Sequence, residues 1–353
     1  MNFASDNVYG ASPEVIDAFI AANSGTQPSY GVDAQTKRAE EMFSQLFGRD
    51  VSVFLMTTGT AANAMGLSAI TPTYQAVLCH AESHVMVDEC AATEFFTGGS
   101  KLIPIWGDDG KITVEALRKT LSQTGIRPPH QIVAASLSLT QATESGTVYT
   151  LDELSDLTAI ARDHDLKVHM DGARFANAIV SLGCTPAEMT WGAGIDVLTF
   201  GMTKNGAIAA DALIFFDKDL AESAPFTRMR TGHLWSKGRY LGAQFCAMLE
   251  GDLWLENARH ANAMARLLAD GLDAVDGVRF ACPVQANEVF PVIPNALHAS
   301  LQDAGAVYAT WPGDGPKGPG TVGDGETLIR LVTSFMTDRQ DVERFVAVAK
   351  GSA

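Results

Sequence analysis

Short, wholly apolar runs alternate with longer helical patterns through the first two thirds of the chain. Seven runs have the length and composition of buried strands: residues 51–56, 76–79, 101–105, 131–138, 166–171, 196–201 and 211–216. Helical patterns such as 113–123 and 151–165 lie between them, the second beginning with a capping-box pattern at Thr150 and Glu153. Apolar strands separated by helices predict an α/β fold with a mostly parallel seven-stranded sheet that is covered on both faces.

The pattern changes after about residue 240. Residues 236–272 read as one long helical stretch, and later runs near 278–281, 288–293 and 328–335 have the character of strands. A chain of 353 residues is long enough for two domains. We expect an N-terminal arm, a large domain and a small C-terminal α+β domain, over residues 1–20, 21–245 and 246–353, with the long helix bridging the two domains.

The Gly- and Pro-rich segment 313–325 contains the G-x-G-x-x-G spacing of a dinucleotide-binding motif, beginning at Gly313. Pro316 and Pro319 stand where such a motif needs a helix N-terminus to meet a pyrophosphate. We therefore predict a loop in this segment and no dinucleotide site.

Charge and composition restrict the class of partner. The formal net charge is −16, which argues against nucleic acid because phosphate backbones are bound by clustered Lys and Arg. The five cysteines are odd in number and scattered, which suits reduced thiols. No secretory signal opens the sequence, and no apolar run is long enough to span a membrane. We expect a cytoplasmic protein that acts on small molecules, with neither nucleic acid nor membrane as partner.

The segment "TTGTAANAMGLSAI" (57–70) follows a predicted strand and opens a helical pattern. Gly59 permits a tight turn there, and a helix N-terminus beside the Thr60 hydroxyl would offer N–H and O–H donors to a phosphate. The same residues also suit an ordinary capped turn between a strand and a helix.

Charged residues follow two of the predicted strands. Asp171 and Arg174 come at the end of the strand 166–171, and Lys204 follows the strand 196–201. Ligands of parallel sheets bind at the carboxyl ends of the strands. Lys204 could form a Schiff base with an aldehyde cofactor there, while Asp171 could keep a pyridine nitrogen protonated. Alternatively, Lys204 is a solvated loop residue and Asp171 forms an ion pair with Arg174.

These features come in the order found in a known family. The segments "SDN", "YG" at 30–31, "TGTAAN", His84 with Glu89, "DGAR", "TKNG" and "IRLVTS" resemble those of low-specificity threonine aldolases and phenylserine aldolases over nearly the whole chain. The resemblance implies the aspartate-aminotransferase fold (fold type I, PLP-dependent transferase-like), the cofactor pyridoxal 5′-phosphate, and a homodimer or homotetramer. It also implies retro-aldol cleavage of L-threonine, L-allo-threonine or phenylserine to glycine and an aldehyde.

The same resemblance implies roles for single residues around the cofactor. Lys204 matches the lysine that binds the aldehyde, Asp171 the partner of the pyridine nitrogen, and His84 the imidazole that stacks on the ring. Gly59 and Thr60 match the turn that binds the phosphate, and Arg239 matches a phosphate contact from a neighbouring subunit.

For the substrate, the resemblance implies that Ser5, Arg174 and Arg330 hold the carboxylate, with Arg174 also beside the cofactor. Two guanidinium groups suit that task because arginine offers paired donors in a fixed geometry.

The sequence departs from the family at two positions. Gln141 stands where many threonine aldolases have a histidine near the substrate hydroxyl. We expect Gln141 to bind the substrate there, since an amide can hydrogen-bond the hydroxyl but cannot accept its proton. Asp88 stands four residues after His84, where relatives often carry Phe or Tyr. Our hypothesis is that His84 removes the proton, aided by Asp88 or a bound water. Alternatively, Asp88 caps a nearby helix.

Three other functions stay open at this point. The same cofactor and scaffold could perform β-elimination or transamination. A metal hydrolase could use His80, His84 and Asp88, which are spaced four residues apart, although the spacing identifies no further ligand and we predict no metal. A relative without catalysis could bind the cofactor alone, but Lys204 and Asp171 together argue against it.

Overall fold

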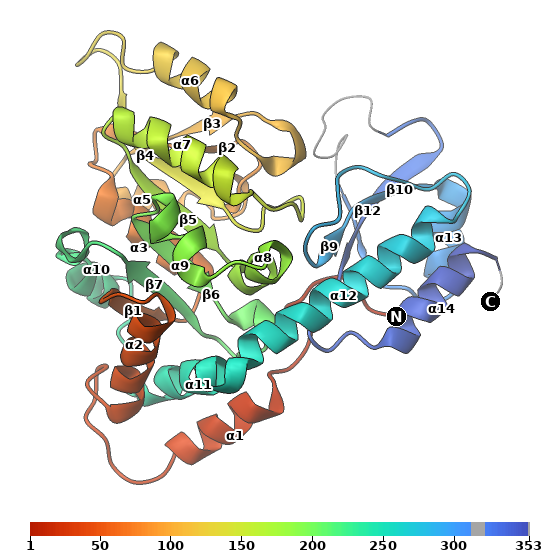
Figure 1. The fold of residues 1–353 in the computed structure, drawn as a ribbon, viewed down its shortest axis with the longest axis horizontal. Coiled ribbons are helices and arrows are strands. Elements are labelled where there is room, and N and C mark those ends of the chain that lie inside the picture. The colour runs from red at the N-terminus through yellow and green to blue at the C-terminus, as the bar shows by residue number, and fades with distance from the viewer. Residues whose placement is uncertain (312–321, 352–353) are drawn as a thin grey trace.

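The computed structural model describes residues 1–311 and 322–351. The seven predicted strands form one sheet in the order β1-β7-β6-β5-β4-β2-β3 (Figure 1). Their bounds are β1 (Ser52–Met56), β2 (Gln75–His80), β3 (Lys101–Ile105), β4 (Val133–Thr140), β5 (Lys167–Gly172), β6 (Val197–Gly201) and β7 (Asp211–Phe215). Strand β7 is antiparallel to both neighbours, whereas the other pairs are parallel. The prediction of a mostly parallel sheet is confirmed.

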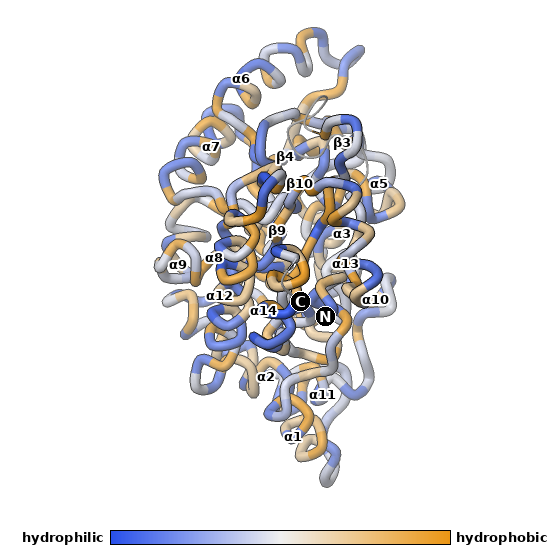
Figure 2. The backbone as a smooth tube through the Cα atoms, turned by 90° about the vertical axis from the view of Figure 1, so that its right-hand side faces the viewer, coloured by the Kyte–Doolittle hydropathy of each residue, from blue (hydrophilic) through white to orange (hydrophobic). Residues whose placement is uncertain are grey.

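Helices cover both faces of this sheet (Figure 1). They are α1 (Pro13–Ala22), α2 (Ala34–Leu46), α3 (Gly59–Ile70), α4 (His84–Val87), α5 (Ala92–Thr97), α6 (Val114–Gln123), α7 (Leu151–Asp163), α8 (Phe175–Leu182), α9 (Pro186–Met189), α10 (Ala224–Arg230) and α11 (Arg239–Leu249). Hydrophilic and hydrophobic residues alternate along α6 and α7 (Figure 2), as expected for helices with one face on a core.

The strands are mostly apolar because alternate side chains enter two separate cores. In β7, Ile214 joins a cluster with side chains of α2, α7, α8 and α11, whereas Leu213 joins one with side chains of α3 and α10. The capping box predicted at Thr150 and Glu153 is present at the start of α7. Both faces of the sheet are therefore buried, and its strand ends are left for ligands.

A second sheet of five short strands lies in the C-terminal part of the chain. Its strands are β8 (Arg279–Phe280), β9 (Glu288–Val289), β10 (Pro291–Pro294), β11 (Ala309–Thr310) and β12 (Glu326–Val332), packed with α13 (Asn295–Asp303) and α14 (Arg339–Ala349). The first residues of the chain join this part, because the Val332 N–H donates to the Phe3 carbonyl at 2.8 Å. The domain limits given above stay predictions, and the G-x-G-x-x-G segment lies outside the described residues.

The predicted continuous helix over 236–272 is wrong. The chain forms α11 and then α12 (Leu253–Asp273), because Gly251 and Asp252 between them have φ angles of 64° and 62°. Left-handed backbone cannot continue a right-handed helix. Helix α12 still joins the two cores, since Trp254 packs in the larger and Leu268 in the smaller. None of the described helices is long and apolar enough to cross a membrane.

Gly66 allows α3 to lie close against the large sheet. A Cβ atom at this position would lie 2.9 Å from Leu213 Cδ1 and 3.2 Å from Val197 Cγ1. We predict that Gly66→Ala lowers the free energy of unfolding by about 1–3 kcal/mol through overpacking. Helix propensity alone would predict the opposite change, because it favours alanine over glycine by about 1 kcal/mol.

Urea denaturation followed by circular dichroism measures this effect. Ser68→Ala on the same helix is the control, because its hydroxyl only bonds back to the Met65 carbonyl and its loss should leave stability nearly unchanged. A Gly66→Ala variant as stable as the parent chain would contradict the close approach.

Candidate active site

Six of the predicted residues line one cleft of about 270 Å³ at the carboxyl ends of the central strands: Gly59, Thr60, His84, Asp171, Arg174 and Lys204. They come from four separate segments of the chain. These segments follow β1, β2, β5 and β6, which all run in the same direction, so their carboxyl ends meet at one edge of the sheet.

The turn after β1 supplies the anion-binding element. Thr58 is the N-cap of α3, and its Oγ1 accepts a hydrogen bond from the Ala61 N–H at 3.3 Å. Gly59 and Thr60 form the first turn of the helix and line the cleft. Their N–H groups have no partner within the helix, so this end carries donors and partial positive charge suited to a phosphate.

Asp171 is the second-last residue of β5, and its carboxylate is only 3% exposed. Its Oδ1 accepts from the Ala173 N–H at 2.9 Å, and its Oδ2 accepts from Asn63 Nδ2 at 2.8 Å. The alternative ion pair with Arg174 does not form, because the Arg174 guanidinium binds other carboxylates. Asp171 is therefore fixed at the cleft wall by hydrogen bonds, and among the described residues it forms no ion pair with Arg174.

Lys204 lies in the short turn that follows β6. Asp211 holds this turn by accepting from the Met202 N–H and the Thr203 hydroxyl, each at 3.2 Å, and Asn205 donates to the Trp254 carbonyl at 2.7 Å. Within the described part of the chain, no ion pair or hydrogen bond engages the Lys204 amine. The backbone is thus tightly held while the amine stays available inside the cleft.

His84 begins α4, and its ring is oriented by a buried carboxylate. Its Nδ1 lies 2.9 Å from Glu89 Oε1, and Glu89 also accepts from Asn63 Nδ2 at 2.8 Å. The hydrogen bond to Glu89 raises the pKa of His84, so the imidazolium form is favoured relative to a free histidine. This direction weighs against the hypothesis that His84 itself removes a proton.

Arg174 lies between two buried carboxylates. Its Nε and Nη2 donate to Asp6 at 2.7 and 3.0 Å, and its Nη1 lies 3.1 Å from Glu288 Oε2. Burial acts to raise the pKa of Asp6, but the charges of Arg174 and Lys204 and the hydrogen bonds from Arg174 and Asn287 together outweigh it, and the pKa is lowered. Arg174 lines the cleft, while the arm and β9 hold it in place.

Five of the predicted site residues do not line the cleft: Ser5, Asp88, Gln141, Arg239 and Arg330. The expectation for Gln141 needs correction. Its amide is fully buried and both ends bond the backbone of Tyr149, each at 2.9 Å, so it faces away from a substrate. Asp88 is exposed at the end of α4 and makes no capping bond at the following helix.

The other three lie outside the cleft in different ways. Arg239 starts α11 and donates to the Gly25 carbonyl at 3.2 Å. Ser5 Oγ accepts from the N–H of Asn7, which lines the cleft, at 3.1 Å. Arg330 lies over the Trp311 ring, and its Nε is buried without a partner among the described residues.

Sequence reasoning assigned no role to several residues that line the cleft, and Asn63 and Glu144 are two of them. Asn63 bridges Asp171 and Glu89, and its signal was a polar side chain within the alanine-rich start of α3. Glu144 follows β4 and accepts the His84 N–H at 2.7 Å. Only the path of the turn after β4 places it there, so the sequence carries no periodic signal for it.

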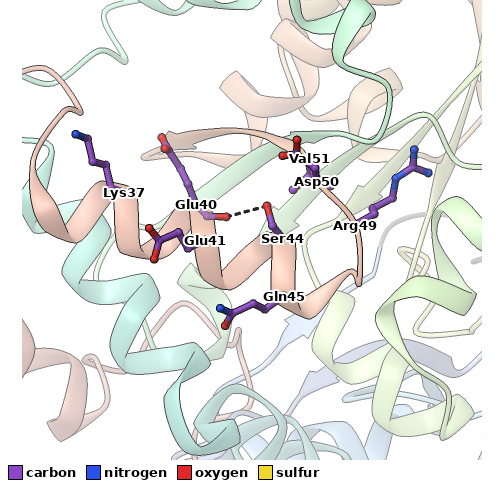
Figure 3. Close-up of a pocket in the computed structure, with 8 residues that line it drawn as sticks. All are labelled: Lys37, Glu40, Glu41, Ser44, Gln45, Arg49, Asp50 and Val51. Carbon is purple, nitrogen blue, oxygen red and sulfur yellow. Dashed lines mark hydrogen bonds between the residues drawn. The ribbon is translucent and has the colours of Figure 1, made fainter.

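The rival metal site does not assemble. His80 uses both ring nitrogens, with Nε2 3.0 Å from the Gly107 carbonyl and Nδ1 accepting the Glu82 N–H at 3.2 Å. Within residues 1–311 and 322–351, no three His, Cys, Asp or Glu side chains are grouped to hold a metal ion. A larger hollow of about 670 Å³ lies over α2, but its side chains point in different directions (Figure 3) and none comes from the strand ends.

The cleft fits pyridoxal 5′-phosphate on the chemistry of its donors. A helix N-terminus suits the phosphate, a buried carboxylate suits the ring nitrogen, and a free amine suits the aldehyde. The Asn63 Oδ1 and Glu89 Oε2 atoms are also buried without partners among the described residues, which leaves acceptors for a bound group.

The sequence matches the family described as β-eliminating lyase over residues 2–295. It is 44% identical to a low specificity L-threonine aldolase of Pseudomonas aeruginosa, over 89% of this chain and 90% of that protein. Low specificity L-threonine aldolase of Escherichia coli is 26% identical over 74% of this chain and 77% of its own length.

Two solved structures agree with this fold. Leishmania major threonine aldolase superposes with a TM-score of 0.91 at 30% identity, covering 99% of this chain and 98% of that one. Sphingomonas wittichii serine palmitoyltransferase shares the fold, with a TM-score of 0.72 at 17% identity over 100% of this chain and 86% of that one. The chain belongs to the β-eliminating lyase family and, within it, to the group of low specificity L-threonine aldolases.

Proposed function

We propose that this protein is a carbon–carbon lyase that cleaves β-hydroxy-α-amino acids by a retro-aldol reaction. Its substrates would be L-threonine, L-allo-threonine or phenylserine, and its products glycine and an aldehyde. The observation that carries the proposal is that Lys204 and Asp171 line one cleft beside the N-terminus of α3. The relatives named low specificity L-threonine aldolase support the same reaction.

The cofactor is pyridoxal 5′-phosphate, and the cleft offers a partner to each of its reactive groups. We assign the aldehyde to Lys204, the ring nitrogen to Asp171, and the phosphate to Gly59 and Thr60. When bound, the cofactor supplies an electron-withdrawing ring that disperses the electron pair left on Cα as the Cα–Cβ bond breaks. His84, oriented by Glu89, would cover one face of the ring.

Arg174 is the residue that we assign to the substrate carboxylate. Asp6 occupies its Nε and Nη2, which leaves Nη1, beside Glu288, for a ligand. Burial raises the pKa of Glu288 against the opposing effect of Arg174, so the carboxyl group beside Nη1 holds its proton more tightly than a free glutamate does. Ser5 and Arg330 stay as proposed helpers, supported by the unpartnered Nε of Arg330.

The side chain at position 88 bears on which aldehyde fits. Asp88 would bring a polar group to a position where an aromatic wall is common in relatives, so phenylserine and threonine are both proposed substrates. Asp88 is exposed and is not among the residues that line the cleft, so its contact with a substrate stays a proposal.

We further propose a cytoplasmic homodimer or homotetramer, with domains at the limits expected from the sequence. Helix α10 exposes 73% of Phe226 and 61% of Met229, and Trp235 follows it at 41%. Clustered exposed apolar side chains of this kind mark contact surfaces. Arg239 follows shortly after them, in keeping with a role at a neighbouring subunit's phosphate.

Product analysis separates the proposed reaction from its runner-up. The purified protein, supplied with pyridoxal phosphate, should convert L-threonine to acetaldehyde and glycine, and DL-phenylserine to benzaldehyde and glycine. The family description also covers β-elimination, which would release ammonia and a keto acid instead. Ammonia without aldehyde would contradict the retro-aldol proposal.

Asp171→Asn tests the charge at the ring nitrogen. The amide keeps the size of the side chain but loses the negative charge, so turnover should fall at least about 100-fold, equivalent to about 3 kcal/mol. Asp196→Asn is the matched control, because Asp196 accepts the Val168 N–H at 2.8 Å at the opposite edge of the sheet. Steady-state assays on folded protein should show turnover retained in the control, and equal losses in both variants would refute the assignment.

A further inference from the structure

Glu144 lines the cleft just after β4, and only one of its two carboxylate oxygens accepts hydrogen bonds from described residues. Its Oε1 accepts from the His84 N–H at 2.7 Å and from the Thr140 hydroxyl at 3.0 Å. These two bonds fix the carboxyl group beside His84, on the side of the cleft to which the ring of the cofactor is assigned.

The second oxygen of Glu144 is left without a partner. Its Oε2 is shielded from water and makes no hydrogen bond to any described residue. Because the torsion of a terminal carboxyl group is broad, a small rotation can present either oxygen to a ligand. A buried polar atom without a partner is rare in native proteins and calls for a functional explanation.

The proton affinity of Glu144 suits exchange near neutral pH. Burial raises its pKa to about 7, helped by the nearby charge of Asp171 and opposed by the His84 N–H. A general acid or base works best when its pKa lies close to the operating pH. At pH 7 Glu144 is therefore present in both its protonated and its ionised form.

The other candidates for this proton transfer are less suitable. The amide of Gln141 is used by the Tyr149 backbone, Asp88 is exposed away from the cleft, and the pKa of His84 is raised by Glu89. The titratable and charged groups around Glu144 that line the cleft or act on its charge are Cys79, His84, Glu89, Tyr149, Asp171, Arg174, Lys204 and Asp211. Glu89 and Glu144 both adjoin His84 and both have a buried oxygen without a partner among the described residues. Glu89 is bound to the ring of His84 and to Asn63, which it serves to position, whereas Glu144 is bound only to the His84 backbone N–H and the Thr140 hydroxyl.

We propose that Glu144 is a catalytic residue that accepts the proton of the substrate's β-hydroxyl, an inference that rests on the proposed retro-aldol function. The O–H bond breaks, its proton moves to the Glu144 carboxylate, and its electron pair becomes the second bond of the aldehyde. The Cα–Cβ bond breaks in the same step, and its electron pair stays with the glycine fragment. One proton leaves the hydroxyl and one is taken up at Cα, so no co-reactant is consumed.

Glu144→Gln keeps the shape of the side chain and removes its basicity. Threonine cleavage should fall at least about 100-fold, the range of a general base. Hydrogen exchange at Cα of glycine, measured by NMR in D₂O, should be retained because glycine has no hydroxyl. The rise of kcat/KM with pH through about 7 should disappear in Glu144→Gln and persist, shifted, in the weaker but basic variant Glu144→Asp.

Glu94→Gln is the matched control, because Glu94 also has a buried Oε2 without a partner among the described residues but lies on α5 outside the cleft. It should leave cleavage, glycine exchange and the pH profile unchanged. A readout independent of turnover is infrared difference spectroscopy of the cofactor-free protein. The parent chain should lose a protonated carboxyl band as the pH rises through about 7, and Glu144→Gln should not.

The outcomes separate this proposal from the proposed function. A parent chain that exchanges the glycine Cα hydrogen but never releases aldehyde refutes retro-aldol cleavage itself. A parent chain that cleaves threonine, with a Glu144→Gln variant of equal rate and pH profile, refutes the role of Glu144 alone. Equal loss of cleavage and glycine exchange in Glu144→Gln also refutes it, because that pattern reports a damaged site.

Discussion

The buried carboxylate of Asp171 is the charge on which the arrangement of the site depends. Burying a carboxylate to 3% exposure costs free energy unless hydrogen bonds stabilise its charge. The Ala173 N–H and the Asn63 amide donate such hydrogen bonds to Asp171. Asn63 also donates a hydrogen bond to Glu89, and Glu89 orients the His84 ring. Asn63 on α3 thereby connects the end of β5 to His84, the residue proposed to cover the ring of the cofactor, and the close packing of α3 on the sheet sets the position of Asn63.

A second constraint ties the separate parts of the chain to this centre. Arg174 follows β5, Asp6 belongs to the N-terminal segment, and Glu288 belongs to β9 of the small sheet. Breaking a buried ion pair by removing one partner is strongly destabilising, because the remaining charge is left uncompensated. The Arg174 guanidinium thus connects the N-terminal segment, the segment after β5 and β9, and it is also the group proposed to bind the substrate carboxylate. Substrate binding at Arg174 would therefore affect all three segments.

Much of this architecture could be predicted from the sequence because buried positions are occupied mainly by apolar residues. Strands buried on both faces are apolar throughout, and Asp171 and Lys204 stood out as charges at their ends. The break at Gly251 and Asp252 was missed because the helical periodicity continues on both sides of it, and only two backbone angles interrupt it. Gln141 was misjudged and Glu144 was missed for a related reason. The turn after β4 decides which side chain enters the cleft, and the backbone of Tyr149 takes the amide that motif order had assigned to the substrate.

The central claim is that Lys204 and Asp171 hold one pyridoxal phosphate between them. Borohydride reduction of the cofactor-loaded protein, followed by peptide mass spectrometry, tests it most directly. The account predicts that the visible absorbance is lost, and that the mass of one reduced cofactor appears on the peptide that contains Lys204. Labelling at another lysine, or absence of any labelled peptide from a protein that is fully loaded, would contradict it.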